Sequence, residues 1–339
     1  MKALKLVTLA FSCAVAFFLS VGLAIAADKV RTFNMPYYPG FPIYVADKMG
    51  LFEKYGIETE PKYFPSGAPI IQAAAAKQWD IAFLGAPPVT LAGPKLGLIT
   101  IGVVQEGANI HRLVGRSDFV AKAKANPSSI KGAKMFVTTM STGHYMVESC
   151  LKMMGLTQED VTIIPSEQTA TVSAFAAGEG DLAQVWPPQD AALLKQGNLE
   201  LCNGAQAGIS IPDMWIAAPH FVEENPDVIV RWLKATTEAI EWIKKDAART
   251  YDMFLQFEQF RGFDLDEAVL REEVGILMEY LNTGPAMLQM MDPGVSGTSY
   301  IAKGYEGVAG FFNRVGRMDG IPDYQPLVNS SFLEKALAN

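Results

Sequence analysis

Two short apolar segments, far apart in the sequence, end in the same way. The first begins at Asp80 and leads into the pair Pro87-Pro88, and the second begins at Asp181 and leads into another such pair at 187–188. Each has the length and apolar content of a buried strand and follows a segment with helical spacing. Because the pattern occurs twice and not in a longer series, it indicates two similar α/β lobes and not a solenoid.

The same alternation of strands and helices extends over most of the chain. We expect strands at residues 30–35, 57–64, 79–84, 134–138, 161–164 and 181–186, and long helices at 228–245, 248–260, 265–280 and 299–314. The predicted first lobe comprises residues 27–116 and 217–339, and the second comprises residues 117–216. The chain then crosses between the lobes near residues 114–117 and 215–219, and two crossings form a hinge.

The first 26 residues predict export. Lys2 and Lys5 precede an apolar run from residue 6 to residue 25, and Ala24 and Ala26 are the small residues of a cleavage site. We expect a signal peptide cleaved after Ala26 and a periplasmic protein, the alternative being an uncleaved membrane anchor. Cleavage removes two lysines and no acidic residue, so the formal net charge changes from −8 to −10.

The acidic character of the mature chain bears on its partners. It contains no basic run interleaved with aromatic residues, so we expect no nucleic-acid partner. Its overall field does not attract anions, so any bound anion must be held by local donors. We expect a monomer that binds a small anionic or zwitterionic ligand.

Two cysteines remain after cleavage, Cys150 and Cys202. In an oxidising compartment they could form a disulfide. Nothing in their spacing specifies a bridge, and unpaired cysteines are often buried as small apolar residues. The sequence therefore favours two unpaired, buried cysteines.

The common motifs of catalysis and metal binding are missing. There is no Walker loop and no Gly-x-Ser-x-Gly elbow, and Gly178-Glu179-Gly180 lacks the third glycine of a dinucleotide fingerprint. The three histidines lie far apart and lack the spacing of metal ligands. We therefore expect neither an enzyme nor a metal or other cofactor.

The strongest candidate for ligand binding is Ser141-Thr142-Gly143-His144, which follows a predicted strand and begins a helix. The start of a helix has free backbone N–H groups and a positive partial charge, which suits an anion. The two hydroxyls add donors, and the glycine allows close approach of the backbone. The alternative is an ordinary helix cap formed by Ser141 or Thr142.

The ends of the two repeated strands provide further candidates, because ligands in open α/β sheets gather at the carboxyl ends of strands. Gly85 and Ala86 end the first strand, and the alternative there is a proline-rich turn without a ligand. Trp186 ends the second, where its indole can close over a ligand or simply pack in the core. Asp213 stands before an apolar run at a predicted crossing. A carboxylate there suits a ligand that also carries a cation, and the alternative is a capping or surface residue.

Aromatic residues near the first two strand ends are Tyr37, Tyr38, Phe41 and Phe64. Most aromatic residues at such places pack in the core, so we expect about one of them to touch the ligand. Tyr38 and Phe41 are the candidates chosen here.

These segments together resemble the periplasmic binding proteins of the nitrate/sulfonate/taurine ABC importers, and most closely their taurine-binding branch. The resemblance covers essentially all of the mature chain, and its specificity comes from the order and spacing of segments that are individually weak. They are 41–46, 50–52, 66–68, 79–85, 141–145, 183–188, 213–216, 323–324 and 329–332.

The resemblance implies a type II periplasmic-binding fold, with the ligand in the cleft between the lobes and ABC permease subunits as partners. By position, Ser141, Thr142, Gly143 and His144 look like sulfonate contacts, and Gly85 and Ala86 like backbone contacts from the first lobe. Trp186 looks like the aromatic that closes the cleft, and Asp213 like the acid that accepts a ligand amine. Family members often have a hydroxyl residue where Ala86 stands, which speaks against plain taurine.

Three alternatives remain open at this point. The ligand could be another small anion or a pyrimidine, because sulfonates, nitrate, carboxylates and pyrimidines all occur on this framework. A pyrimidine-forming enzyme of thiamine biosynthesis shares the fold, but it carries a cysteine cluster that this chain lacks, and it is not exported. A receptor subunit that signals is the third alternative.

Overall fold

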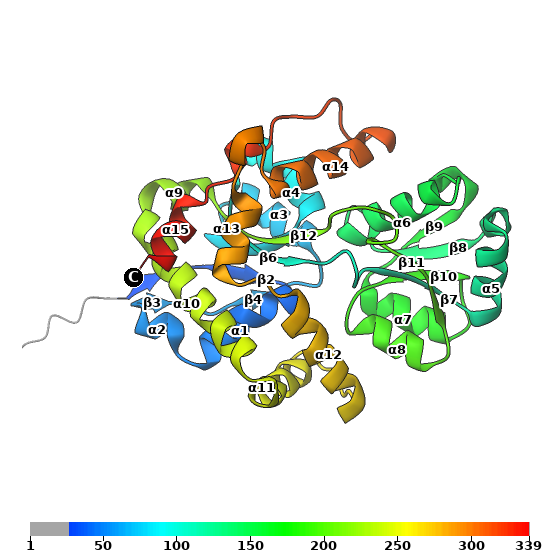
Figure 1. Ribbon diagram of the computed structural model, residues 1–339, viewed down its shortest axis with the longest axis horizontal. Coiled ribbons are helices and arrows are strands. Elements are labelled where there is room, and N and C mark those ends of the chain that lie inside the picture. Colours follow the sequence, from blue (N-terminus) through cyan, green and yellow to red (C-terminus); the bar gives the residue numbers. More distant parts are fainter. Residues whose placement is uncertain (1–26, 339) are drawn as a thin grey trace, which may run out of the picture.

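The computed structural model describes residues 27–338. The predicted signal peptide, residues 1–26, lies outside the described residues. The chain forms two lobes side by side, each built around its own five-stranded sheet (Figure 1). The α/β class and the two-lobed architecture predicted from the repeated strands are therefore confirmed.

The sheet of the first lobe has the strand order β4-β2-β5-β12-β6. Its strands are β2 (Thr32–Asn34), β4 (Lys62–Tyr63), β5 (Ile81–Gly85), β6 (Ile99–Glu106) and β12 (Pro212–Ala217). Strand β2 is parallel to β4 and β5, whereas β12 lies antiparallel between β5 and β6. This register sets Asp213 opposite Gly85 on one side and Gln105 on the other.

Helices from both ends of the chain cover this sheet. They are α1 (Phe41–Lys48), α2 (Leu51–Lys54), α3 (Gly67–Ala75), α4 (Ala86–Leu96), α9 (Pro219–Glu224), α10 (Pro226–Lys245), α11 (Ala247–Phe260), α12 (Glu267–Tyr280), α13 (Gly284–Met291), α14 (Tyr300–Arg314) and α15 (Ser331–Leu337). A small parallel pair, β1 (Asp28–Lys29) and β3 (Ile57–Glu58), lies at the edge. The four long helices predicted after residue 226 are thus present, and they return to the first lobe as expected.

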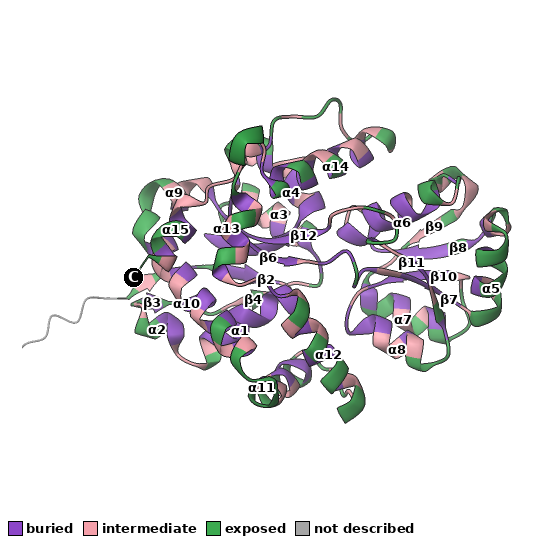
Figure 2. Ribbon diagram, viewed as in Figure 1, coloured by how far each residue is buried: buried purple, intermediate pink, exposed green. Residues whose placement is uncertain are grey.

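The sheet of the second lobe has the order β11-β7-β10-β8-β9. Its strands are β7 (Arg112–Gly115), β8 (Lys134–Val137), β9 (Thr162–Pro165), β10 (Leu182–Val185) and β11 (Leu199–Asn203), and its helices are α5 (Ser117–Ala125), α6 (Thr142–Met153), α7 (Gln168–Ala176) and α8 (Gln189–Lys195). In both lobes most strand residues are buried, except in β4 and β9, while most of the helices expose one face (Figure 2).

The repeated aspartates have the same structural role in both lobes. Asp80 precedes β5 and accepts a hydrogen bond from the backbone N–H of Arg31, at 2.8 Å. Asp181 precedes β10 and accepts one from the backbone N–H of Lys134, also at 2.8 Å. Each carboxylate therefore ties the start of one strand to the start of the parallel strand beside it, which explains why the pattern recurs.

The crossings between the lobes lie earlier than predicted. The chain leaves β6 at Glu106 and enters β7 at Arg112, and it leaves β11 at Asn203 and enters β12 at Pro212. The crossings are therefore residues 107–111 and 204–211, and they are joined by a hydrogen bond from Gly107 N–H to the Ile211 carbonyl at 2.8 Å. That the two lobes move as separate bodies stays a prediction.

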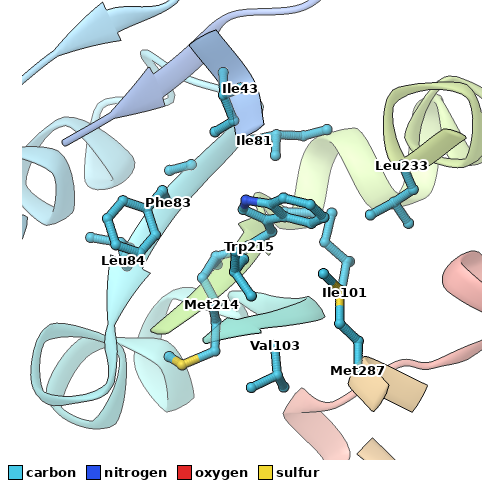
Figure 3. Close-up of a cluster of buried hydrophobic side chains, with 14 of the residues drawn as sticks. Ile43, Ile81, Phe83, Leu84, Ile101, Val103, Met214, Trp215, Leu233 and Met287 are labelled. Carbon is cyan, nitrogen blue, oxygen red and sulfur yellow. The ribbon is translucent and has the colours of Figure 1, made fainter. Parts of the chain in front are cut away.

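Trp215 shows why the predicted second crossing was misplaced. Its side chain is fully buried among residues of β5, β6, α1, α10 and α13, including Ile81, Ile101, Leu233 and Met287 (Figure 3). The apolar run that contains it is thus a central strand of the first lobe. A short run flanked by proline does not reveal this, because its two partner strands are distant in the sequence.

Cys150 and Cys202 form a disulfide, so the expectation of two unpaired cysteines is wrong. The bridge joins α6 to β11, across 52 positions of sequence. The two elements meet only in the folded second lobe, which is why the spacing gave no indication of the bridge.

Candidate ligand-binding site

A cavity of about 170 Å³ lies between the two lobes. Strand ends and the loops that follow them contribute its lining from both sides, as the fold class leads one to expect. The lining includes Met35, Pro36, Tyr37, Pro65, Ser66, Gly67, Ala68, Gly85, Pro88 and Asp213 from the first lobe, and Thr138, Thr139, Met140, Ser141, Thr142, Glu167, Gln168, Thr169, Trp186 and Gln189 from the second, with His111 from a crossing and Arg261 and Phe263 from the segment after α11. A cavity of about 150 Å³ holds a molecule of the size of benzene, so this one suits a small organic ligand.

Five of the predicted site residues line this cavity, namely Gly85, Ser141, Thr142, Trp186 and Asp213. They come from β5, the start of α6, the end of β10 and β12. The structure thus brings together residues that are widely separated in the sequence.

The other five do not line it. Tyr38 and Phe41 are fully buried and pack against Phe254 of α11 in the first-lobe core. Ala86 is also buried outside the lining. Their neighbour Tyr37 lines the cavity instead, so one of the four aromatic residues singled out from the sequence reaches it.

Gly143 and His144 follow Thr142 in α6 but do not line the cavity. A Cβ atom on Gly143 would lie 2.0 Å from the side chain of Gln184, so this glycine allows α6 to pack on β10. The His144 ring accepts a hydrogen bond from Met140 N–H at 3.2 Å and pairs with Gln158 at 3.0 Å. Burial lowers the pKa of His144, which therefore provides no cation for an anion site.

Ser141 is the N-cap of α6, so the capping alternative applies to its side chain. Its hydroxyl donates to the Thr138 carbonyl at 2.6 Å and accepts from the N–H groups of Gly143 and His144 at 3.1 and 3.4 Å. Thr142, in contrast, lines the cavity, and its hydroxyl takes no part in this cap. Of the two hydroxyls predicted to hold an anion, that of Thr142 remains available.

The lobes touch each other at the cavity. A Cβ atom on Gly85 would lie 2.6 Å from the Thr142 hydroxyl oxygen and 3.4 Å from Oδ1 of Asp213. The Ser66 hydroxyl, at the start of α3, donates a hydrogen bond to Oε1 of Glu167, at the start of α7, at 3.4 Å. Gly85 is therefore a place where any larger residue would force the lobes apart.

Asp213 is the most unusual charged group in the lining. Its side chain is 2% exposed, and within the described part of the chain its buried Oδ2 has no hydrogen-bond partner. Burial raises the pKa of this carboxyl well above its usual range, and the nearby Glu106 raises it further. A buried carboxylate without a partner is costly, so the site favours either a proton or a cation here.

Several polar residues in the lining were not predicted, and three of them have a buried atom without a partner within the described residues. His111 and Gln189 are buried, and their atoms Nδ1 and Oε1 have no hydrogen-bond partner within the described residues. Burial lowers the pKa of His111 to about 3, so its ring is neutral. Arg261 is held by Glu258 at 2.6 Å, and its Nε also lacks a partner. No sequence signal marks these residues, because only the tertiary structure places them at the cavity.

The described residues contain no group of three or more His, Cys, Asp or Glu side chains that could hold a metal ion. No helix within residues 27–338 is long and apolar enough to cross a membrane.

Two sheets, two crossings and a cavity between the lobes are the features of the type II periplasmic-binding fold. Among solved structures, the periplasmic aliphatic sulphonate binding protein SsuA from Escherichia coli aligns with a TM-score of 0.73 and 17% identity, over 89% of this chain and 92% of that one. The predicted fold is thereby confirmed.

The chain belongs to the NMT1/THI5-like family, whose model matches residues 40–249. A protein of Bacillus subtilis named "Putative aliphatic sulfonates-binding protein" is 29% identical over 304 residues, which is 87% of this chain and 85% of that protein. The taurine-binding periplasmic protein of Escherichia coli is 29% identical over 203 residues, 58% of this chain and 62% of that protein. The resemblance stated from the sequence is confirmed by these relatives.

Proposed function

We propose that this protein is the periplasmic solute-binding component of an ABC importer and that it binds a small amino-sulfonate in the cavity between its lobes. The fold, the family and the names of the two relatives support the general class. The choice of a zwitterionic ligand is supported by the charges in the cavity.

Asp213 is the observation that carries this choice. A simple anion such as nitrate would have to enter a cavity that already contains a buried carboxyl group without a partner. Its negative charge would then disfavour ionisation of Asp213 still more. A ligand ammonium, in contrast, supplies the missing counter-charge, and a charge-assisted hydrogen bond of this kind is strong.

The start of α6 is the place for the sulfonate. Its N-cap is Ser141, and the next residue, Thr142, lines the cavity with a hydroxyl that takes no part in the cap. The positive end of this 12-residue helix favours an anion. Both Thr142 Oγ1 and Asp213 Oδ1 lie close to the same face of Gly85, so the two ends of a short amino-sulfonate can be bound together.

A sulfonate without an amine is the second candidate, because two of the similar proteins are named as binding proteins for aliphatic sulfonates. It would bind at the same helix start and would leave Asp213 protonated. The proposed class also implies export and partners. Residues 1–26 would act as a signal peptide for transport to the periplasm, and ABC permease subunits would receive the ligand.

A thermal-shift screen of the purified mature protein tests the proposal. It compares 2-aminoethanesulfonate with ethanesulfonate, nitrate and an aromatic acid at equal concentrations. A ligand at 100 times its Kd stabilises a protein by about 2.7 kcal/mol, which is readily seen as a rise in Tm. The proposal expects the largest rise with the amino-sulfonate, and it fails if nitrate or the aromatic acid stabilises the protein and the sulfonates do not.

A further inference from the structure

Three buried polar atoms without partners surround one part of the cavity. They are Oδ2 of Asp213, Nδ1 of His111 and Oε1 of Gln189, and the side chains that carry them are at least nine-tenths buried. Buried polar atoms in native proteins are nearly always hydrogen-bonded to protein, water or ligand. The lining has a fourth such atom, Nε of Arg261, which is a donor. The other three point to a bound group that satisfies them together.

All three side chains line the same cavity, and contacts with Gly107 and Trp186 link their positions. A Cβ atom on Gly107 would lie 3.4 Å from Oδ2 of Asp213 and 3.3 Å from Cδ2 of His111, so these two flank the same point of the first crossing. The His111 ring packs edge-on against Trp186, with the centroids 5.6 Å apart. Gln189 is bound to Trp186 through its backbone N–H, at 3.0 Å from the Trp186 carbonyl.

All three atoms can accept hydrogen bonds. A carboxylate oxygen and an amide oxygen only accept hydrogen bonds. The neutral His111 ring places Nε2 3.4 Å from the Tyr37 hydroxyl. When Nε2 carries the ring proton and donates it to Tyr37, Nδ1 is left as an acceptor. The set then comprises three acceptors and one negative charge.

We propose that Asp213, His111 and Gln189 form a socket for a primary ammonium group, so that the ligand is a primary amino-sulfonate and not an N-alkylated one. A primary ammonium has three N–H donors, one for each acceptor. This inference rests on the proposed function, and it deepens it by naming two further residues that determine specificity. Every N-methyl group added to the ligand removes one donor and leaves one buried acceptor unsatisfied.

The socket also includes residues of both lobes and of a crossing between them. Asp213 belongs to β12 of the first lobe, Gln189 to α8 of the second lobe, and His111 to a crossing. An ammonium bound to all three is held by both lobes at once. A ligand without it contacts the lobes only through its sulfonate and its carbon chain.

Calorimetry with three ligands tests the socket: 2-aminoethanesulfonate, its N-methyl derivative and ethanesulfonate. The variants are Gln189→Met, His111→Leu and His111→Asn, the last of which keeps a polar group near the position of Nδ1. Gln196→Met is the matched control, because Gln196 is exposed at the end of the same helix α8. The Tm of each unliganded variant shows whether it is folded.

We expect Gln189→Met and His111→Leu each to raise the Kd for 2-aminoethanesulfonate by about 10-fold to 100-fold, the loss typical of a hydrogen bond to a charged group. The Kd for ethanesulfonate should change by less than about 3-fold, and His111→Asn should recover most of the loss. Wild-type protein should bind the N-methyl ligand at least about 10-fold more weakly than the primary amine, and Gln189→Met or His111→Leu should reduce that difference.

The socket is overturned if wild-type protein binds both amines equally, or if the two variants weaken ethanesulfonate as much as the amino-sulfonate. These results leave the proposed function intact so long as Asp213→Asn still weakens the amino-sulfonate selectively. A wild-type protein that binds no sulfonate overturns the proposed function itself, and with it the socket.

Discussion

Replacing Asp213 by asparagine distinguishes two possible roles of this residue. It either pairs with a charge on the ligand or has a purely structural role. The side chain is 2% exposed and its Oδ2 has no partner within residues 27–338, so the substitution at that atom removes a charge and breaks no bond that the protein itself makes. Unliganded Asp213→Asn should therefore be as stable as wild type, or more stable at high pH.

The effect on binding is expected to be large and specific. Removing one partner of a buried ion pair costs about 3–5 kcal/mol, so the Kd for 2-aminoethanesulfonate should rise at least about 100-fold. Ethanesulfonate has no ammonium, and its affinity should stay the same or improve, because a carboxyl group near its sulfonate is lost. The difference between the two ligands is the coupling energy of the ammonium with Asp213.

Calorimetry of both ligands with both proteins measures this cycle. Glu167→Gln is the matched control, because Glu167 lines the same cavity but is exposed, and it should change both affinities only slightly. Since burial raises the pKa of unliganded Asp213, binding of the ammonium should also release protons, and the affinity should increase as the pH rises towards that pKa. An equal loss for both ligands would refute the reasoning and make Asp213 a structural residue.

Further predictions concern capping, pH and the disulfide. Ser141→Ala should lower stability by about 1 kcal/mol through loss of the α6 cap, whereas Thr142→Ala should leave Tm nearly unchanged and raise the Kd for sulfonates about 10-fold; equal effects on Tm would contradict this. Burial raises the pKa of Glu273 to about 8. The contribution of its protonated form to stability is therefore complete below the unfolded-state pKa and is lost as the pH rises to about 8. Glu273→Gln should remove this pH dependence of the free energy of unfolding, measured by denaturant titration. Reducing the bridge between Cys150 and Cys202 should lower stability by about 4 kcal/mol on the loop-entropy model, measured as a fall in Tm with reductant, and an unchanged Tm would show that the bridge is not formed in solution.

Much of the fold could be predicted because the signals for it are local. The alternation of strands and helices, and the aspartates that precede β5 and β10, indicate two α/β lobes directly in the sequence. The position of β12 could not be predicted in the same way. It is antiparallel to both of its neighbours in a sheet that is otherwise assembled from earlier parts of the chain, so only its distant partners define it.

The candidate site divides in a similar way. Gly85, Thr142 and Trp186 lie at strand ends or helix starts, where the fold class itself indicates a ligand. His111 and Gln189 matter because their polar atoms are left without partners in the folded protein, which is a property of the tertiary structure and not of local sequence.

The central claim is that a small amino-sulfonate binds between the lobes and closes them without being converted. Spin labels at Gln72→Cys on α3 and Ser173→Cys on α7, both exposed, report the separation of the two lobes across the cavity. During titration with 2-aminoethanesulfonate, the population of short label distances should increase and saturate at one ligand per chain, and the ligand should be recovered unchanged. Unchanged distances at saturating ligand, or consumption of the ligand, would contradict the account.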